Sequence, residues 1–190
     1  MLEKIRVFLS IDIEDESLLS QVSRIQSRLD QEAAKLKLVE KDSIHFTLRF
    51  FGDTSLSRIE EMRNLLGTLE ITPFTILIEG VGAFPSPRRP NVIWIGVSQN
   101  SQQIIELKAR IDTLLVSLGY PPEKGFKAHA TIARVRAVKD RERTLRNLES
   151  LVRESIGTMT VYSFRMTKST LKPSGPVYET LWEIPGRKSN

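Results

Sequence analysis

The hydrophobic and polar residues of this chain alternate in several short stretches, with the period of two that is typical of β-strands. In the first stretch Ile5, Val7 and Leu9 share an apolar face, and Arg6 and Ser10 lie on the other face. The same alternation predicts further strands at residues 44–50, 74–82, 92–98, 128–135, 156–171 and 177–184.

Between these strands, apolar residues recur every three or four positions, which is the spacing of an amphipathic helix. Asp15 or Ser17 stands where the first helix needs an N-cap, and this helix is predicted to run to about Lys35. Ser57 with Glu60 forms a capping-box pattern before the second helix, and Gly119 is expected to end the third. The apolar faces of the four helices are Leu18, Val22, Ile25 and Leu29; Ile59, Met62, Leu65, Leu66 and Leu69; Ile104, Leu107, Ile111, Leu114, Leu115 and Leu118; and Leu145, Leu148 and Leu151.

The order of these elements repeats along the chain. Each half reads strand, helix, strand with a histidine, helix, strand, and His45 and His129 are 129 − 45 = 84 residues apart. From Phe8 to His45 is 37 residues and from Trp94 to His129 is 35, so we expect an internal duplication over about residues 5–83 and 91–171, with a last strand at 177–184. The predicted fold class is α+β. Residues 1–190 would form a single domain of two lobes related by a pseudo-twofold axis. Antiparallel-rich sheets would face each other across a cleft, and helices would cover their outer faces.

Residues 84–90 separate the two halves. Three prolines fix the backbone of this segment and disfavour regular structure, so it is predicted to be a rigid loop that links the halves. The loop also presents Arg88 and Arg89, which are candidates for contacts with phosphate.

Composition and charge narrow the class of protein. Of the 190 residues, 40% are hydrophobic and 27% are charged, there is no cysteine, and we find no apolar run of the roughly 20 residues that a membrane helix needs. The first six residues lack the apolar core of a signal peptide, so we expect a cytoplasmic protein without a membrane anchor. No obligate protein partner is evident in the sequence. The net charge is +5, and the last 95 residues hold 16 Lys and Arg against 9 Asp and Glu. This excess suits a polyanionic partner, but taken alone it more often marks a solvated helix face.

The candidate chemistry centres on His45 and His129, which are the only histidines of the chain. Each lies in an apolar strand pattern, two residues before Thr47 or Thr131, so each pair projects from one face of its strand. A histidine titrates near neutral pH, so two of them can serve as base and acid on a phosphodiester. The threonine hydroxyls can donate to the phosphate oxygens.

Other sites are less consistent with the sequence. Two histidines could bind a metal, but no third and fourth ligand stand at a helpful spacing. No nucleophile elbow and no complete glycine-rich phosphate loop appear. Phe8 and Trp94 could stack on nucleobases, although aromatic residues in strands more often pack in the core.

The paired His-x-Thr motifs resemble those of the 2H phosphoesterase superfamily. The likeness is closer to its RNA 2′,3′-cyclic phosphodiesterases, once named 2′-5′ RNA ligases, and it spans nearly the whole chain. Where many relatives have proline before the second histidine and Ile-Thr-Leu after it, this chain has Ala128 and then Ala130-Thr131-Ile132. The segments that carry the resemblance are residues 6–12, 45–53, 84–94, 125–134 and 169–178.

The resemblance implies hydrolysis of a 2′,3′-cyclic phosphate at an RNA end to a 2′-phosphate, without a metal or another cofactor, and with 2′-5′ RNA ligase activity as a possible reverse reaction. It implies that His45 donates a proton to the leaving O3′, that His129 accepts one from water, and that Thr47 and Thr131 hold phosphate oxygens. It also assigns a phosphate contact to Arg134. Strict alternation places Arg134 on the face opposite His129, so it reaches the cleft only if the strand bulges or ends there.

Two alternatives remain open at this point. The same cleft would suit a module that binds RNA ends without turnover, or a phosphodiesterase that acts on another small cyclic phosphate. Incubation with a cyclic-phosphate dinucleotide separates turnover from binding. All of these readings keep the paired histidines at the centre, so two imidazoles that lay far apart in the fold would exclude them together.

Overall fold

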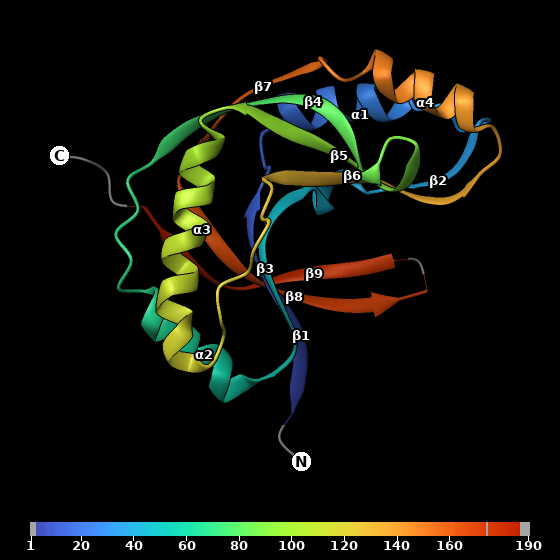
Figure 1. Ribbon diagram of the computed structural model, residues 1–190. Coiled ribbons are helices and arrows are strands. Elements are labelled where there is room, and N and C mark those ends of the chain that lie inside the picture. The colour runs from blue at the N-terminus through green and yellow to red at the C-terminus, as the bar shows by residue number, and fades with distance from the viewer. Residues whose placement is uncertain (1–2, 174, 187–190) are drawn as a thin grey trace.

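The computed structural model describes residues 3–173 and 175–186, which fold into one curled sheet covered by helices (Figure 1). Ser174, between the strands predicted at residues 156–171 and 177–184, lies outside the described residues. The strands are β1 (Lys4–Asp12), β2 (Ala34–Leu38), β3 (His45–Ser55), β4 (Phe74–Ser86), β5 (Arg89–Gln99), β6 (His129–Val138), β7 (Ser155–Val161), β8 (Ser163–Lys172) and β9 (Gly175–Pro185). The helices are α1 (Glu16–Ser27), α2 (Leu56–Leu66), α3 (Ser101–Leu115) and α4 (Arg141–Ser150), with short 3-10 turns at Lys41–Ser43 and Val116–Leu118.

The sheet consists of two antiparallel halves. Its strand order is β7-β4-β5-β6-β3-β1-β8-β9, and β2 pairs with the far part of β6. β3 and β6 meet in the middle through a single residue pair, Phe46 with Ala130, whereas the other neighbouring strands pair over at least four residues. The α+β class and the antiparallel sheets with helices on their outer faces are therefore confirmed, and the two histidine strands lie at the junction.

The two halves of the sheet do not coincide with the two halves of the sequence. β4 comes from the first repeat but pairs with β5 of the second, and β8 comes from the second but pairs with β1 of the first. The helices also exchange, because α1 packs on β6 and β7 while α2 and α3 pack together beside β3 (Figure 1). Each half of the sheet therefore contains strands of both repeats. The tight turn between β4 and β5 explains this, since it forces β4 to lie beside β5.

Three local predictions also need correction. Residues 84–90 are not a free loop, because β4 runs to Ser86 and β5 starts at Arg89, which leaves a two-residue turn. The strand predicted over residues 156–171 is two strands, β7 and β8, that bend apart at the exposed Tyr162 and run to different parts of the sheet. The apolar residues change phase at this bend, from Met159 and Val161 to Phe164 and Met166, and the prediction missed this signal. The first helix ends at Ser27 rather than near Lys35, because residues 34–38 form β2.

Helix caps were predicted with mixed success. Asp15 is the N-cap of α1, and its carboxylate accepts hydrogen bonds from the backbone N–H groups of Ser17 and Leu18. α2 is capped by Ser55, which accepts from the N–H of Arg58, and not by the predicted box that starts at Ser57. Gly119 adopts the left-handed conformation that ends the 3-10 turn after α3, as expected.

The hydrophobic core lies between the sheet and its helices. In β3 and β6 the residues beside the catalytic candidates are buried, including Phe46, Leu48, Ala130 and Ile132. These apolar residues anchor both strands and leave the alternate side chains of His45 and His129 facing away from the core. No helix among the described residues is long and apolar enough to cross a membrane.

Candidate active site

His45 and His129 are the first residues of β3 and β6, and the two strands bring them into one cleft of about 810 Å³. Phe46 pairs with Ala130, and antiparallel strands run in opposite directions, so His45 lies across from Thr131 and Thr47 across from His129. All four side chains line the cleft. Because only one residue pair joins the strands, they diverge on both sides and leave space between them.

Both imidazoles are held in the same way by the backbone two residues earlier. Nδ1 of His45 lies 2.9 Å from the carbonyl oxygen of Ser43, and Nδ1 of His129 lies 2.7 Å from that of Lys127. A carbonyl oxygen can only accept a hydrogen bond, so in the neutral ring Nδ1 carries the proton. We therefore assign the tautomer that leaves Nε2 of each histidine as the nitrogen that can exchange a proton with a bound substrate.

Burial lowers the pKa of both histidines below the ordinary value, but the charges around them differ. At His45 the Ser43 carbonyl and the Asp12 carboxylate raise the pKa again, and the charge of His129 lowers it. At His129 the Lys127 carbonyl raises the pKa, and the Lys127 ammonium lowers it further. The carboxylate thus favours a protonated His45, and the ammonium favours a neutral His129.

Each histidine strand has a bulge three residues after its histidine. In β3, Ser10 pairs with Thr47 and Leu9 with Arg49, so Leu48 is the extra residue. In β6, Trp94 pairs with Thr131 and Ile93 with Ala133, so Ile132 is extra. A bulge moves every later side chain to the opposite face.

The bulges decide which residues enter the cleft. Arg134 returns to the face of His129 and lines the cleft, which resolves the conflict with strict alternation. At the matching position of β3 the cleft receives Phe50, which is 54% exposed. Strict alternation after His45 and Thr47 predicts Arg49 on their face, and this is wrong, because its guanidinium is buried and bound to Asp112.

The repeat equivalence also shifts. In strand register, Trp94 corresponds to Ser10 and not to Phe8. Ser10 and Trp94 each lie 35 residues before a histidine, and they pair with Thr47 and Thr131, respectively. Phe8 is 1% exposed, and its ring is stacked on His45 with the centroids 4.8 Å apart. The prediction that Phe8 contacts substrate therefore needs correction, because it supports the imidazole from behind and has no free face for a nucleobase.

The second histidine has its own aromatic frame. Phe84 meets His129 edge-on at 4.8 Å between ring centroids, and Trp94 does so at 6.2 Å. Nζ of Lys127 lies 4.0 Å from the centroid of a Trp94 ring, which fixes this ammonium near His129. On the other side, Tyr178 of β9 meets His45 edge-on at 5.3 Å.

Arg88 and Arg89 are not part of this site. Both are exposed at the turn between β4 and β5, and neither lines the cleft, so the structure does not bring these predicted residues to the histidines. The cleft does contain basic residues that the sequence reasoning missed: Lys37 of β2, Lys127 and Arg136. Phe50 could have been found from the sequence, since it follows His45 by five residues as Arg134 follows His129.

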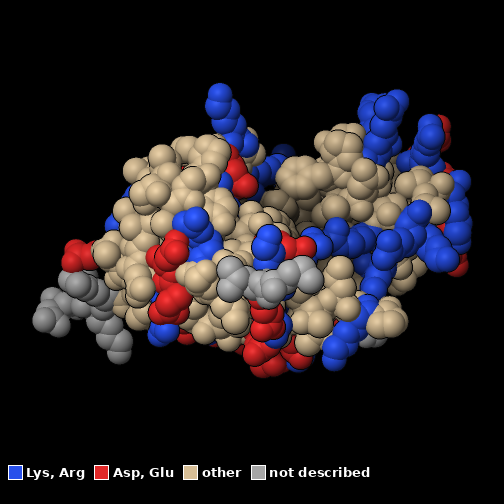
Figure 2. All heavy atoms as spheres, turned by 90° about the horizontal axis from the view of Figure 1, so that it is seen from below, with Lys and Arg blue, Asp and Glu red and all other residues tan. Residues whose placement is uncertain are grey.

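The cleft is electropositive overall, because Glu40 and Glu123 are its acidic residues against several Lys and Arg. Figure 2 shows many Lys and Arg on the right side of the molecule, where Figure 1 draws β2, α4 and the β8–β9 hairpin, while Asp and Glu lie more toward the middle and left. Among residues 3–173 and 175–186, no three His, Cys, Asp or Glu side chains gather as metal ligands. This arrangement can bind an anion between two proton-exchanging nitrogens.

Comparison with known proteins gives a consistent picture. A model of the LigT-like phosphoesterase family matches residues 11–94 and again residues 95–178. An RNA 2′,3′-cyclic phosphodiesterase of Methanothermobacter thermautotrophicus is 37% identical over 177 residues, which cover 92% of this chain and 95% of that protein.

Two solved structures share the fold. The crystal structure of a Thermus thermophilus protein superimposes with a TM-score of 0.78 and 24% identity, over 98% of this chain and 100% of that one. Escherichia coli LigT complexed with 3′-AMP gives a TM-score of 0.77 and 22% identity, over 98% of this chain and 99% of that one.

Proposed function

The chain belongs to the LigT-like phosphoesterase family, and on that premise we propose that it hydrolyses the 2′,3′-cyclic phosphate at the end of an RNA strand to a 2′-phosphate. The observation that carries the proposal is the single cleft in which two His-Thr pairs face each other from β3 and β6. Residues 1–190 act as one bilobal domain in this proposal, since each half-sheet contains strands of both repeats. We place the enzyme in the cytoplasm, where such RNA ends would be its substrates.

His129 is the base and His45 the acid. Nε2 of His129 removes a proton from a water molecule as the water oxygen attacks phosphorus, and Nε2 of His45 gives a proton to O3′ as the P–O3′ bond breaks. The products are a 2′-phosphate and a free 3′-hydroxyl. His129 is left with one proton more and His45 with one fewer, and exchange with solvent restores both. The charges support this assignment, because Lys127 disfavours a proton on His129 and Asp12 favours one on His45.

The remaining residues of the cleft bind the phosphate and the nucleoside. Thr47 and Thr131 donate hydrogen bonds to the non-bridging oxygens, on which negative charge builds up in the transition state. Arg134 adds a charge-assisted contact to the same oxygens. The ribose stays attached to phosphorus through O2′, and with its base it lies on the side of the acid, where the exposed ring of Phe50 and the ring of Tyr178 offer apolar surface.

The body of the RNA follows the basic side of the cleft. Lys37 and Arg134 are direct partners across β2 and β6, and Arg136 lies two residues farther along β6. These cations would contact phosphates upstream of the cyclic end, which makes binding of longer RNA sensitive to salt.

The test is product analysis on a short RNA with a 2′,3′-cyclic phosphate end. We expect complete conversion to the 2′-phosphate, followed by phosphorus NMR, in the presence of a chelator. Binding without product would instead identify a module for RNA ends, and activity that requires an added divalent ion would contradict the two-histidine mechanism. A 2′,3′-cyclic mononucleotide and a 3′,5′-cyclic one, run in parallel, separate the RNA substrate from other small cyclic phosphates. RNA with a free 5′-hydroxyl tests whether a ribose oxygen can replace water and form a 2′-5′ bond.

A further inference from the structure

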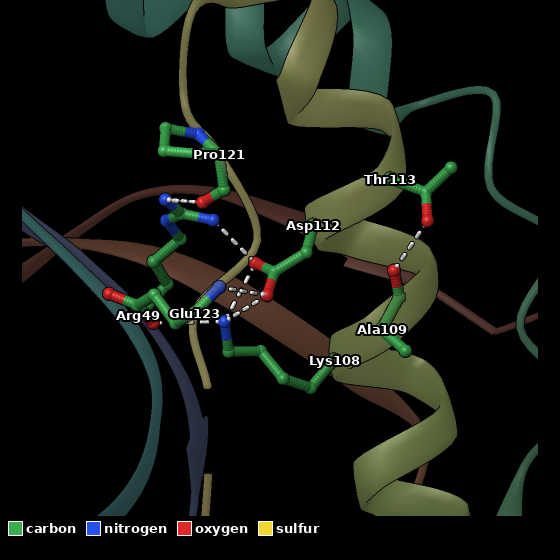
Figure 3. Close-up of polar contacts among 7 residues, drawn as sticks. All are labelled: Arg49, Lys108, Ala109, Asp112, Thr113, Pro121 and Glu123. Atoms are coloured by element: carbon green, nitrogen blue, oxygen red, sulfur yellow. Dashed lines mark hydrogen bonds and ion pairs between the residues drawn. The ribbon is translucent and has the colours of Figure 1, made fainter. Parts of the chain in front are cut away.

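A buried cluster of four charges joins β3 to the loop that leads into β6 (Figure 3). Its members are Arg49 of β3, Lys108 and Asp112 of α3, and Glu123 of the loop. The side chains of Arg49, Lys108 and Asp112 are at most 6% exposed, whereas that of Glu123 is 46% exposed and lines the cleft. The charges of the two cations and two anions cancel. Burial of charged groups costs desolvation free energy, however, so stability alone is a weak explanation for the cluster.

The position of Arg49 follows from the bulge at Leu48. Without that extra residue the guanidinium would face the cleft beside His45, and with it the side chain turns inward toward α3. The matching residue of β6 is Ala133, so the second histidine strand has no such side chain. The cluster is therefore one of the features that break the symmetry of the two repeats.

Asp112 is the centre of the cluster. Its Oδ1 accepts from Nη1 of Arg49 at 2.6 Å and from Nζ of Lys108 at 2.7 Å, and its Oδ2 accepts from Lys108 at 2.6 Å. The same Oδ2 accepts from the backbone N–H of Glu123 at 3.2 Å, and Lys108 donates to the Glu123 carboxylate at 2.9 Å. One carboxylate thus ties a strand, a helix and a loop together.

Arg49 also holds the loop directly. Its Nη2 donates to the carbonyl oxygen of Pro121 at 2.7 Å, and its guanidinium carbon lies 5.7 Å from the ring centroid of Tyr120. The loop, residues 119–128, contains neither helix nor strand, so side chains rather than a hydrogen-bonded ladder set its path. Figure 3 shows the loop passing between Arg49 and α3, with Pro121 and Glu123 turned toward these side chains.

The same loop ends at the carbonyl that orients the second histidine. Lys127 accepts from Nδ1 of His129 at 2.7 Å, and Glu123 and Lys127 both line the cleft. His45 has a separate support, since its Ser43 carbonyl belongs to the 3-10 turn at Lys41–Ser43, which is closed by its own backbone bond from Ser43 to Glu40. Loss of the cluster would therefore disturb one imidazole and not the other.

We propose that Arg49, through Asp112 and the loop of residues 119–128, is a positioning residue that holds the imidazole of His129 in its catalytic orientation. The predicted effect on rate rests on the proposed function. The predicted effect on the orientation of the His129 imidazole does not. Arg49 borders the cleft, but its guanidinium is buried and bound to Asp112 and Pro121, so its effect would pass through the backbone that carries the Lys127 carbonyl.

The test uses the fact that the chain contains two histidines. Nitrogen NMR of the imidazoles gives two sets of signals, assigned with His45→Gln and His129→Gln, that report the tautomer and the bonding of Nδ1. The variant is Arg49→Lys, which keeps the charge beside Asp112 but cannot also span to Pro121 as the guanidinium does. Arg58→Lys, at the exposed Arg58–Glu61 pair of α2, is the matched control.

In Arg49→Lys we expect the signals of His129 to shift or broaden while those of His45 stay as in the parent chain. On the cyclic phosphate we expect kcat to fall about 10- to 100-fold, with KM changed less than about twofold. Arg58→Lys should change neither. If Arg49→Lys does not fold, Glu123→Ala, at the half-exposed end of the cluster, should perturb His129 in the same direction but less.

Unchanged signals of His129 in the folded variant would overturn the proposal, and so would equal changes at both histidines, which indicate a general loss of structure. The NMR result does not depend on turnover. A selective change at His129 in a chain without phosphodiesterase activity would support the positioning role and refute the proposed function separately.

Discussion

The two histidine strands are alike in their backbone and unlike in their surroundings. β3 and β6 each start with a histidine whose Nδ1 faces a carbonyl two residues back, place a threonine two residues on, and bulge one residue later. Around His45 stand Asp12, Phe8 and Tyr178, and around His129 stand Lys127, Phe84 and Trp94.

The duplication thus supplies two equivalent His-Thr pairs, and the residues around each pair have diverged. A symmetric pair can approach a phosphorus atom from two sides, but it cannot choose which nitrogen takes the first proton. In the proposed mechanism, the opposite charges of Asp12 and Lys127 would favour one choice, and the residues five positions after the histidines, Phe50 and Arg134, would orient the substrate to match.

The largest expected effect comes from removing either histidine. His45→Ala and His129→Ala should each lower the turnover of cyclic-phosphate RNA by about 10²- to 10⁴-fold without loss of folding. A phosphodiester with p-nitrophenolate as leaving group separates the roles, because this anion departs without a proton. On it, His45→Ala should retain much more of the parent activity than His129→Ala, as measured by release of p-nitrophenolate.

The reverse order on this substrate would exchange the roles of the two histidines. Full activity of both variants on the RNA would refute the mechanism altogether. Far-ultraviolet circular dichroism of each variant checks that the loss is chemical and not structural.

Much of the fold follows from local pattern. The alternation around Phe46 and Ala130 predicts two anchored strands with their histidines on the other face, and the repeat of 84 residues predicts that the strands are equivalent. The exchange of β4 and β8 between the half-sheets is not local. It depends on how tight the turn after Ser86 is and on where β8 runs after the bend at Tyr162. The change of apolar phase at Tyr162 marks the bend, but it does not say with which strand β8 pairs.

The sequence predicts the residues of the candidate site that are identified by residue type and spacing. It does not predict side-chain directions beyond a single extra residue that shifts the strand register. Leu48 and Ile132 read as ordinary apolar alternates, yet as bulge residues they turn Arg49 inward and Arg134 outward. Lys37 and Tyr178 reach the cleft from strands that are distant in sequence, so only the tertiary structure brings them there.

The second prediction concerns Arg134. Arg134→Gln removes a fixed charge beside the phosphate and should lower kcat/KM by about 10²-fold, as measured by initial rates on the cyclic phosphate. Arg88→Gln, at an exposed arginine outside the cleft, is the matched control and should remain within about twofold of the parent. Equal losses in the two variants would mean that general positive charge, and not a contact at position 134, drives the reaction.

The third prediction concerns Phe50, which occupies the matching place beside His45. Phe50→Ala removes the exposed ring and should raise KM for the cyclic nucleotide on the order of tenfold while kcat changes little, since stacking stabilises ground state and transition state alike. Phe50→Tyr keeps the ring and should behave like the parent. A fall in kcat with an unchanged KM would show that the ring serves the chemistry of His45 and not the binding of the nucleoside.

The smallest effect tests the charges that make the two histidines different. Asp12→Asn removes the carboxylate that raises the pKa of His45, so this pKa should fall, and Asn can still accept from Arg165. Lys127→Met removes the ammonium that lowers the pKa of His129 but keeps an aliphatic chain over Trp94, so this pKa should rise.

NMR titration of the two imidazoles measures both shifts directly. Each variant should move the pKa of one histidine and leave that of the other nearly in place, and the two shifts should have opposite signs. If both histidines moved together in either variant, the asymmetry would lie in their mutual interaction, and the roles of acid and base would need another cause.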